Sequence, residues 1–199
     1  IVIRPFYIAK YLTTYTQFRA FIKGGEYEDS RWWDGFPSGY QPQKPDNVTN
    51  GNANAPRDTV SWYQSVAFGR WMSHKLRGLR MPNPFVEMTP ALSTDNLGII
   101  SREFVVGDNA EIRLPTEWEW QWAAQSGTET REYPWGGWQN GYANTSEAGI
   151  NDRSTAVGLY PHGGTVCGAL DMAGNLREWC QNDRGEVMVV DGFGNGNSK

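Results

Sequence analysis

The chain has 199 residues and a formal net charge of −4, and 20% of its residues are charged while 14% are aromatic. This composition is typical of one packed globular domain rather than a disordered chain. The acidic balance, with no basic cluster and no long apolar run, argues against nucleic acid and anionic membranes as partners, and we expect neither a membrane span nor a signal peptide within these residues.

Three helices are predicted from a repeated start signal, the capping box. In this motif a Thr or Ser side chain accepts a backbone N–H three residues later, and a Gln or Glu at that later position reaches back. The three boxes are Thr14–Gln17, Ser61–Gln64 and Thr116–Glu119. We expect the helices to end just before Gly24, near Gly78 and at Gly127, because glycine commonly follows the last helical residue.

The spacing of apolar residues predicts which helix faces are buried. In the first helix, one face carries Tyr15, Phe18, Phe21 and Ile22. In the third helix we expect Trp118, Trp122 and Ala123 to point inward, and the small alanine to permit close packing.

Outside the helices, 23 Gly and 11 Pro break the chain into turns and short strands. We expect a long loop at Arg31–Asn54, an irregular segment at Pro82–Ala110, a strand at Glu186–Asp191 and a flexible tail at Gly192–Lys199. The long loop carries Trp32, Trp33 and Phe36, whose rings either stack on a ligand or pack the loop onto the body; we favour packing slightly. A few helices with short strands and many loops indicate the α+β class.

The most informative stretch is Ala169–Trp179, which resembles the G-L-x-D-M-x-G-N-V-x-E-W signature of formylglycine-generating-enzyme-like domains, also called the sulfatase-modifying-factor family. Four further segments resemble motifs of that family, in the family's order: Arg4–Tyr11, Pro56–Trp71, Arg113–Trp120 and Tyr133–Gly136. The resemblance implies a variant of the C-type lectin fold, with three short helices, short antiparallel strands and many loops. It also implies a single domain over residues 1–199 with an insertion at about 83–110, and a family C-terminal part that is missing from the chain.

Asp171 and Glu178 bracket a turn centred on Gly174. Carboxylate and carbonyl oxygens that converge at such a turn suit Ca²⁺; the alternative is that Asp171 caps the turn and Glu178 pairs with an arginine. The resemblance favours the metal, because the family's oxidase carries a calcium site at this block. Matched by position, the implied ligands are Asp171, Gly174, Leu176 and Glu178.

A second calcium site is implied by the resemblance of Tyr142–Thr145 to a Y-A-N segment of the family. Its ligands would be the side chain of Asn144, the carbonyl of Thr145 and an acidic residue further on. Asp152 is our choice for that residue and Asn151 is the alternative. A plain asparagine turn explains the segment equally well.

The chain has two cysteines, Cys167 and Cys180. Two reduced, buried thiols are favoured over a disulfide. The family's oxidase binds copper(I) through a cysteine pair near an R-G-G-S segment after the block, and no such segment or pair follows Cys180 here. The resemblance therefore implies that the protein is not an oxidase, or that the chain is cut short. His74 and His162, the only histidines, are expected on a helix surface and in a loop.

We rank three functions in order of preference. The first is a non-catalytic ligand-binding domain on a C-type-lectin scaffold, such as the variable protein of a diversity-generating retroelement, with structural calcium and an unknown protein or small molecule as ligand. The second is a copper-dependent formylglycine-generating oxidase whose active cysteines lie beyond residue 199. The third is a partner-docking module of a larger protein. Cytoplasm and cell surface both stay open as the compartment.

Overall fold

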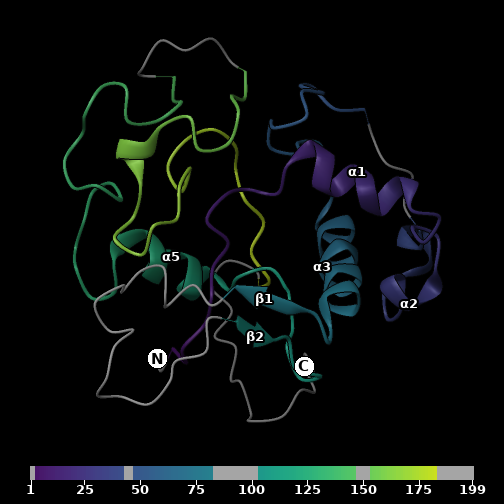
Figure 1. Ribbon diagram of the computed structural model, residues 1–199. Helices are drawn as coiled ribbons and strands as arrows, with labels where there is room; N and C mark the ends of the chain where they lie inside the picture. The colour runs from purple at the N-terminus through teal and green to yellow at the C-terminus, as the bar shows by residue number, and fades with distance from the viewer. Residues whose placement is uncertain (1–2, 43–46, 83–102, 147–152, 183–199) are drawn as a thin grey trace, which may run out of the picture.

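The computed structural model describes residues 3–42, 47–82, 103–146 and 153–182. In these residues the helices are α1 (Tyr15–Lys23), α2 (Ser30–Trp33), α3 (Trp62–Leu76) and α5 (Glu117–Gln125), with short 3₁₀ helices η1 (Ser38–Tyr40) and η3 (Pro161–Gly163). Two strands, β1 (Arg80–Pro82) and β2 (Glu103–Val105), pair antiparallel. Figure 1 shows α1, α2 and α3 grouped on one side of the molecule and α5 on the other, with loops filling much of the rest. The α+β class is confirmed.

The three capping boxes are confirmed, each with both of its hydrogen bonds. The backbone N–H of the third helical residue donates to the capping hydroxyl at 3.2 Å in all three helices. The side chains of Gln17, Gln64 and Glu119 accept from the N-cap backbone N–H at 2.8, 2.9 and 2.8 Å. Each helix begins one residue after its cap, so the helix starts are specified locally.

The helices α1, α2 and α3 enclose the larger core, which is mainly aromatic. Its buried members are Phe18, Phe21, Tyr27, Trp32, Trp33, Ala67 and Trp71. Of the predicted face of α1, Phe18 and Phe21 are buried, and Ile22 packs against the cluster from its edge. Such rings remove large apolar areas from water, so this cluster contributes most to the stability of that side of the molecule.

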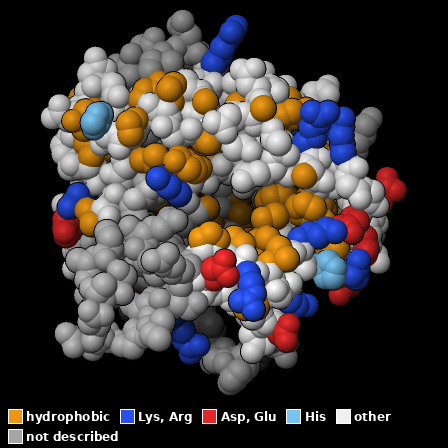
Figure 2. All heavy atoms as spheres, viewed as in Figure 1, with side chains coloured by type: hydrophobic (Ala, Val, Ile, Leu, Met, Phe, Trp, Pro, Cys, Tyr) orange, Lys and Arg blue, Asp and Glu red, His pale blue; other side chains and the backbone are white. Residues whose placement is uncertain are grey.

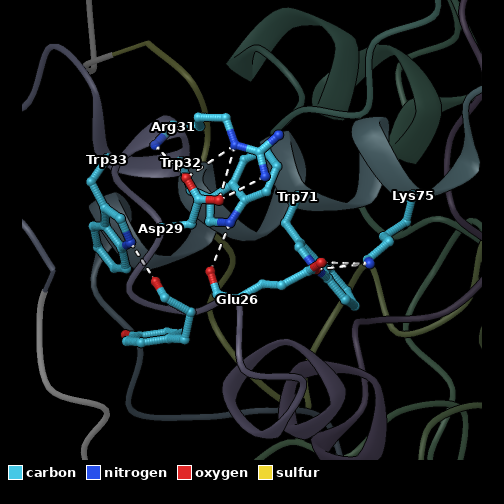
Figure 3. A network of polar contacts seen from close by, with 8 residues as sticks. Glu26, Asp29, Arg31, Trp32, Trp33, Trp71 and Lys75 are labelled. Carbon is cyan, nitrogen blue, oxygen red and sulfur yellow. Dashed lines mark hydrogen bonds and ion pairs between the residues drawn. The ribbon is translucent and has the colours of Figure 1, made fainter.

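A polar network closes the edge of this core (Figure 3). The indole N–H of Trp32 donates to the Glu26 carbonyl at 2.8 Å, and that of Trp33 donates to the Tyr27 carbonyl at 2.7 Å. The Glu26 carboxylate accepts from the Trp71 indole at 2.7 Å. Lys75 donates to the same carboxylate at 2.9 Å. Each indole thus buries its ring while its N–H stays paired, as a buried tryptophan requires.

The expected long loop at Arg31–Asn54 is partly wrong, because its start is helical. Asp29 caps α2 by accepting the backbone N–H of Arg31 at 3.0 Å, and η1 follows at Ser38–Tyr40. A helix of four residues leaves almost no periodic pattern in the sequence. The capping aspartate is the one local signal that could have found it.

The expected inward face of α5 is wrong for both tryptophans. Trp118 and Trp122 are 40% and 42% exposed, whereas Ala123 and Ala124 are buried. These alanines pack with Ala169 and Met172 in a second, smaller core, with Trp120 at its edge. Two small side chains let the helix approach the backbone of the 169–172 segment closely, and the bulky indoles at 118 and 122 then lie on the opposite, open face.

Strand β2 lies inside the segment expected to be irregular, Pro82–Ala110, and that expectation is wrong for residues 103–105. The register joins Arg80 to Val105 and Pro82 to Glu103. The insertion expected at about 83–110 falls largely on residues 83–102, outside the described residues. The strand expected at 186–191, the flexible tail, and residues 151 and 152 also lie outside them.

Candidate functional site

The block 169–179 forms a sharply folded turn. Asp171 and Asn175 both have a φ of 62°, and Gly174 has a φ of 86°. Asparagine and aspartate tolerate this left-handed conformation better than most other residues, and glycine adopts it without cost. The sequence therefore places tolerant residue types at the three positions where the turn requires them.

The carboxylate of Asp171 is held from two sides. The residue is 7% exposed. Its Oδ2 accepts the backbone N–H of Gly158 at 2.8 Å, and its Oδ1 accepts the amide of Asn175 at 3.3 Å. These bonds fix the direction of the carboxylate without neutralising its charge. In the part of the chain that the structure describes, no Lys or Arg forms an ion pair with Asp171.

Glu178 lies at the other end of the turn, and its charge is unfavourable there. The residue as a whole is exposed, but neighbouring protein atoms partly desolvate its carboxyl group. This desolvation raises its pKa to about 7; the Trp120 indole opposes the shift, and the negative charge of Asp171 adds to it. The indole N–H stands near the carboxylate but makes no hydrogen bond of normal geometry with the described residues. The expected alternative, an arginine partner for Glu178, is not found among those residues.

Asn144, from the second predicted site, lies directly against this block. Its carbonyl accepts the backbone N–H of Asn175 at 2.8 Å. Its side-chain amide donates to the Arg153 carbonyl at 2.8 Å and to the Asn175 side chain at 3.4 Å. The structure therefore brings together Asn144 and Thr145 with the block that carries Asp171, a proximity that the sequence did not reveal. Asp152 lies outside the described residues.

The chain after Glu178 is bonded to the starts of two helices, which the sequence did not reveal either. The Trp62 indole donates to the Cys180 carbonyl and the Trp179 indole to the Val60 carbonyl, both at 2.9 Å. The Asn182 side chain accepts the backbone N–H of Glu117 at 2.8 Å, at the N-terminus of α5. In Figure 1 this yellow-green end of the described chain runs between the sides of α5 and α3.

Carboxylate and carbonyl oxygen atoms, the ligand type that a hard divalent cation prefers, lie around the turn. Two carboxylates repel each other there without a described cationic partner, and the carbonyls of Gly174 and Leu176 accept no hydrogen bond from described residues. The Asn175 amide donates to the Thr155 carbonyl, and the Thr155 Oγ1 is buried without a hydrogen-bond partner among the described residues. No group of three His, Cys, Asp or Glu side chains gathers within the described residues, so a metal here would need backbone carbonyls.

The two cysteines do not fit a copper(I) site. They form no disulfide: Cys167 is an exposed free thiol, which corrects the expectation that it is buried, and it contacts the Thr165 hydroxyl at 3.0 Å. Cys180 is half-buried, and burial raises the pKa of its thiol, with the charges of Glu178 and Glu117 adding to the shift. A raised pKa disfavours the thiolate that copper(I) requires.

The remaining candidate residues lie elsewhere. Trp32 and Trp33 are 4% and 1% exposed, and Phe36 packs against the same core, so little of their surface is open to a ligand. His74 lies exposed on α3, against the Trp32 ring, and His162 lies exposed in η3. Figure 2 shows apolar side chains gathered around a hollow near the middle of the viewed face. No helix among the described residues is long and apolar enough to cross a bilayer.

Comparison with known proteins agrees with the family resemblance seen in the sequence. The profile of the sulfatase-modifying factor enzyme 1-like domain matches residues 1–194. A formylglycine-generating enzyme of Thermomonospora curvata is 24% identical over 88% of this chain and 59% of its own length. A hercynine oxygenase of Mycolicibacterium thermoresistibile is 27% identical over 87% of this chain and 35% of its own length. The chain thus spans little more than half of the first relative and about a third of the second.

These relatives correct one prediction. The expectation of a non-catalytic ligand-binding domain, such as a retroelement variable protein, is wrong, because the relatives are named as enzymes. The expectation rested on the missing cysteine pair. That absence concerns a few residues, whereas the match extends over almost the whole chain.

Proposed function

Because this chain belongs to the sulfatase-modifying-factor family, we propose that it forms the frame of an oxygen-dependent oxidase of the formylglycine-generating type. The substrate would be a cysteine side chain of a polypeptide. We also propose the finer description of the fold: a C-type-lectin variant over residues 1–199, in one domain, with an insertion at about 83–110.

One observation carries the proposal: the family profile covers residues 1–194 of this chain. The geometry supports it, because the most characteristic block lies at a junction of the fold. Segment 178–182, which continues the chain from the end of this block, bonds to the starts of α3 and α5. A site built on two helix starts is held more rigidly than one on a free loop, which preorganised chemistry needs.

We propose Ca²⁺ as the structural cofactor of this frame. Asp171, Gly174, Leu176 and Glu178 would hold one ion, and Asn144 and Thr145 with Asp152 would hold a second. At the first site the cation would offset the desolvation, and the smaller repulsion by Asp171, that raise the pKa of Glu178. It would also use the backbone carbonyls of Gly174 and Leu176, which no described donor occupies. Calcium in this role stabilises the turn and takes no part in electron transfer.

The redox centre is not assigned to these residues. The family's oxidase uses copper on a cysteine pair, and Cys167 and Cys180 do not fit that role. Cys167 lines an open groove between the N-terminal segment and α5, whereas the backbone carbonyl of Cys180 accepts the Trp62 indole N–H. In this proposal the described residues fold the domain, orient the substrate and exclude water. Other parts of the polypeptide would supply the oxidising cysteine pair.

The test is an aldehyde assay on the polypeptide that carries this sequence. The protein is loaded with copper and incubated with a cysteine-containing peptide, once in air and once without oxygen. Aldehyde, trapped by an aminooxy reagent and measured by mass spectrometry, is expected only in air. The double variant Cys167→Ser with Cys180→Ser is the matched control and is expected to retain activity. No aldehyde from the copper-loaded protein would overturn the proposal, as would loss of activity in a folded double variant.

A further inference from the structure

An open groove of about 560 Å³ lies between the N-terminal segment, residues 3–8, and the C-terminal end of α5. Figure 1 shows the purple N-terminal segment passing beside α5. The helix contributes Trp122 to one wall, and the turn at 165–169 contributes Val166 and Cys167 to another. The volume of the groove falls within the range of small-molecule sites in proteins, about 300–1,000 Å³.

Hydrogen bonds hold the walls of the groove in place. At the end of α5, the Gly127 N–H donates to the Trp122 carbonyl at 2.8 Å. The Val166 N–H donates to the Ser126 hydroxyl at 3.4 Å, which joins the turn at 165–169 to the end of the helix. The groove is therefore formed without a ligand, and a ligand that binds there pays little for ordering the protein.

Apolar side chains line most of the groove and are partly open to water. Val166 is 68% exposed and Trp122 is 42% exposed. A smaller hollow of about 200 Å³ continues along the same face of α5, and the two hollows share Ile3, Trp122 and Gly127. A ligand with flat apolar rings would remove this surface from water and stack on the Trp122 indole.

Arg4 supplies the charge of the groove. The described residues that line the two hollows include no Asp, Glu or Lys and no other Arg. Arg4 is exposed and forms no ion pair with the described residues, although the net charge of the protein is −4. A guanidinium binds a carboxylate through paired N–H donors. The groove therefore complements a ligand that is apolar except for one carboxylate.

A polypeptide strand suits this groove less well than a small acid. Each residue of a strand brings a backbone N–H and C=O that need partners. Besides Arg4, the polar side chains among the described lining residues are Ser126 and Cys167. The Ser126 hydroxyl already accepts the Val166 N–H, and the Cys167 thiol contacts the Thr165 hydroxyl. A ligand with a single polar end leaves no polar group of its own unpaired in the groove.

We propose that this groove binds a small aromatic carboxylic acid, with its rings against Trp122 and Val166 and its carboxylate on Arg4. This binding site does not depend on the oxidase assignment or on calcium. Cys167 reports whether the groove is occupied, because its exposed thiol lies on the wall and a bound ligand shields it from reagents in solution.

The experiment measures the rate at which iodoacetamide alkylates Cys167, with peptide mapping by mass spectrometry to follow Cys180 separately. The probe is naphthylacetate, and naphthylacetamide is its match with the same rings and no charge. The acid is expected to slow the alkylation of Cys167 saturably and to leave that of Cys180 unchanged. The amide should need about two- to fivefold more for half of the effect, which is what an exposed ion pair contributes.

Two variants test the contacts. Arg4→Gln is expected to make the acid bind no better than the amide, and Trp122→Ala should raise the concentration needed of either probe by about tenfold or more. Should Trp122→Ala fail to fold, Arg4→Gln still tests the proposal, because it changes an exposed side chain. Arg19→Gln and Trp138→Ala are the matched controls, at exposed positions outside the lining, and should bind both probes as the wild type does.

Three results would overturn the proposal. The first is an alkylation rate of Cys167 that neither probe changes saturably. The second is equal protection by the acid and the amide in the wild-type protein. The third is protection by N-acetyltryptophanamide at a lower concentration than the acid requires, which would indicate a peptide site instead. The measurement needs no turnover, so failure of the oxidase assignment is a separate result.

Discussion

Gly69 of α3 lies against the backbone of Ile112, and a Cβ at position 69 would stand 2.8 Å from the Ile112 carbonyl oxygen. The Ser73 hydroxyl, one helical turn further on, accepts the Ile112 N–H at 2.7 Å. Together these contacts dock the segment before α5 onto α3.

Gly69→Ala is expected to destabilise the protein in spite of alanine's higher helix propensity. Alanine gains about 1 kcal/mol over glycine in a helix interior. Overpacking against backbone costs about 1–3 kcal/mol, and here the obstacle is a carbonyl that cannot rotate away. We expect a net loss of about 1 kcal/mol in a urea melt. Gly39→Ala, with no atom near the added Cβ, is the control; an unchanged Gly69→Ala melt would contradict the docking.

Glu178→Gln is expected to act differently with and without calcium. In excess chelator the substitution removes a desolvated charge that Asp171 repels, so the melting temperature should hold steady or rise. In Ca²⁺ at one hundred times its dissociation constant, the wild type should gain about 2.7 kcal/mol, and the variant should lose most of that gain. Glu129→Gln at an exposed ion pair is the control. Equal shifts in both conditions would refute the metal site.

The Glu119–Arg113 pair predicts a pH dependence of stability. Arg113 donates to Glu119 at 2.7 Å and holds the pKa of that carboxyl below the unfolded value of 4.5. Between the two pKa values the unfolded chain binds more protons, so this stabilisation is complete above pH 4.5 and is lost as the pH falls through the folded pKa. Denaturant melts of the wild type and Glu119→Gln should therefore differ at pH 7 and converge in acid. A constant difference at all pH values would contradict the prediction.

Two tryptophan substitutions should separate core from surface. Trp33→Ala removes a ring that is 1% exposed and should cost about 3–5 kcal/mol, enough to threaten folding. Trp118→Ala removes a ring that is 40% exposed, and should change stability by only about 0.5 kcal/mol or less. Thermal melts of both variants measure the two losses of stability. A loss for Trp118→Ala as large as that for Trp33→Ala would show that the open face of α5 is covered.

Features that depend on neighbouring residues could be predicted from this sequence, whereas features that depend on residues far along the chain could not. The helix starts at Thr14, Ser61 and Thr116 could be predicted because a capping box is contained within four residues. The face of α5 could not, because whether Trp118 or Ala123 points inward depends on what packs there, namely Ala169 and Met172 from much later in the chain.

The same distinction between local and distant features applies to the candidate site. Its turn could be predicted from the motif, which contains three residues with positive φ: Asp171, Gly174 and Asn175. The contact of Asn144 with Asn175 could not be predicted, since two asparagines 31 residues apart carry no pattern that pairs them. The bond of Asn182 to the start of α5 was missed for the same reason.

The bonds between segment 178–182 and the helix starts also set an order for folding during synthesis. The aromatic core is complete once α3 ends at Leu76, whereas the bond from Trp62 to Cys180 spans 118 residues and that from Trp179 to Val60 spans 119. At about 5–20 residues per second, a ribosome needs roughly 5–20 s to make the intervening chain. During that time the Trp62 indole and the Val60 carbonyl at the start of α3 lack the partners that segment 178–182 supplies in the folded protein.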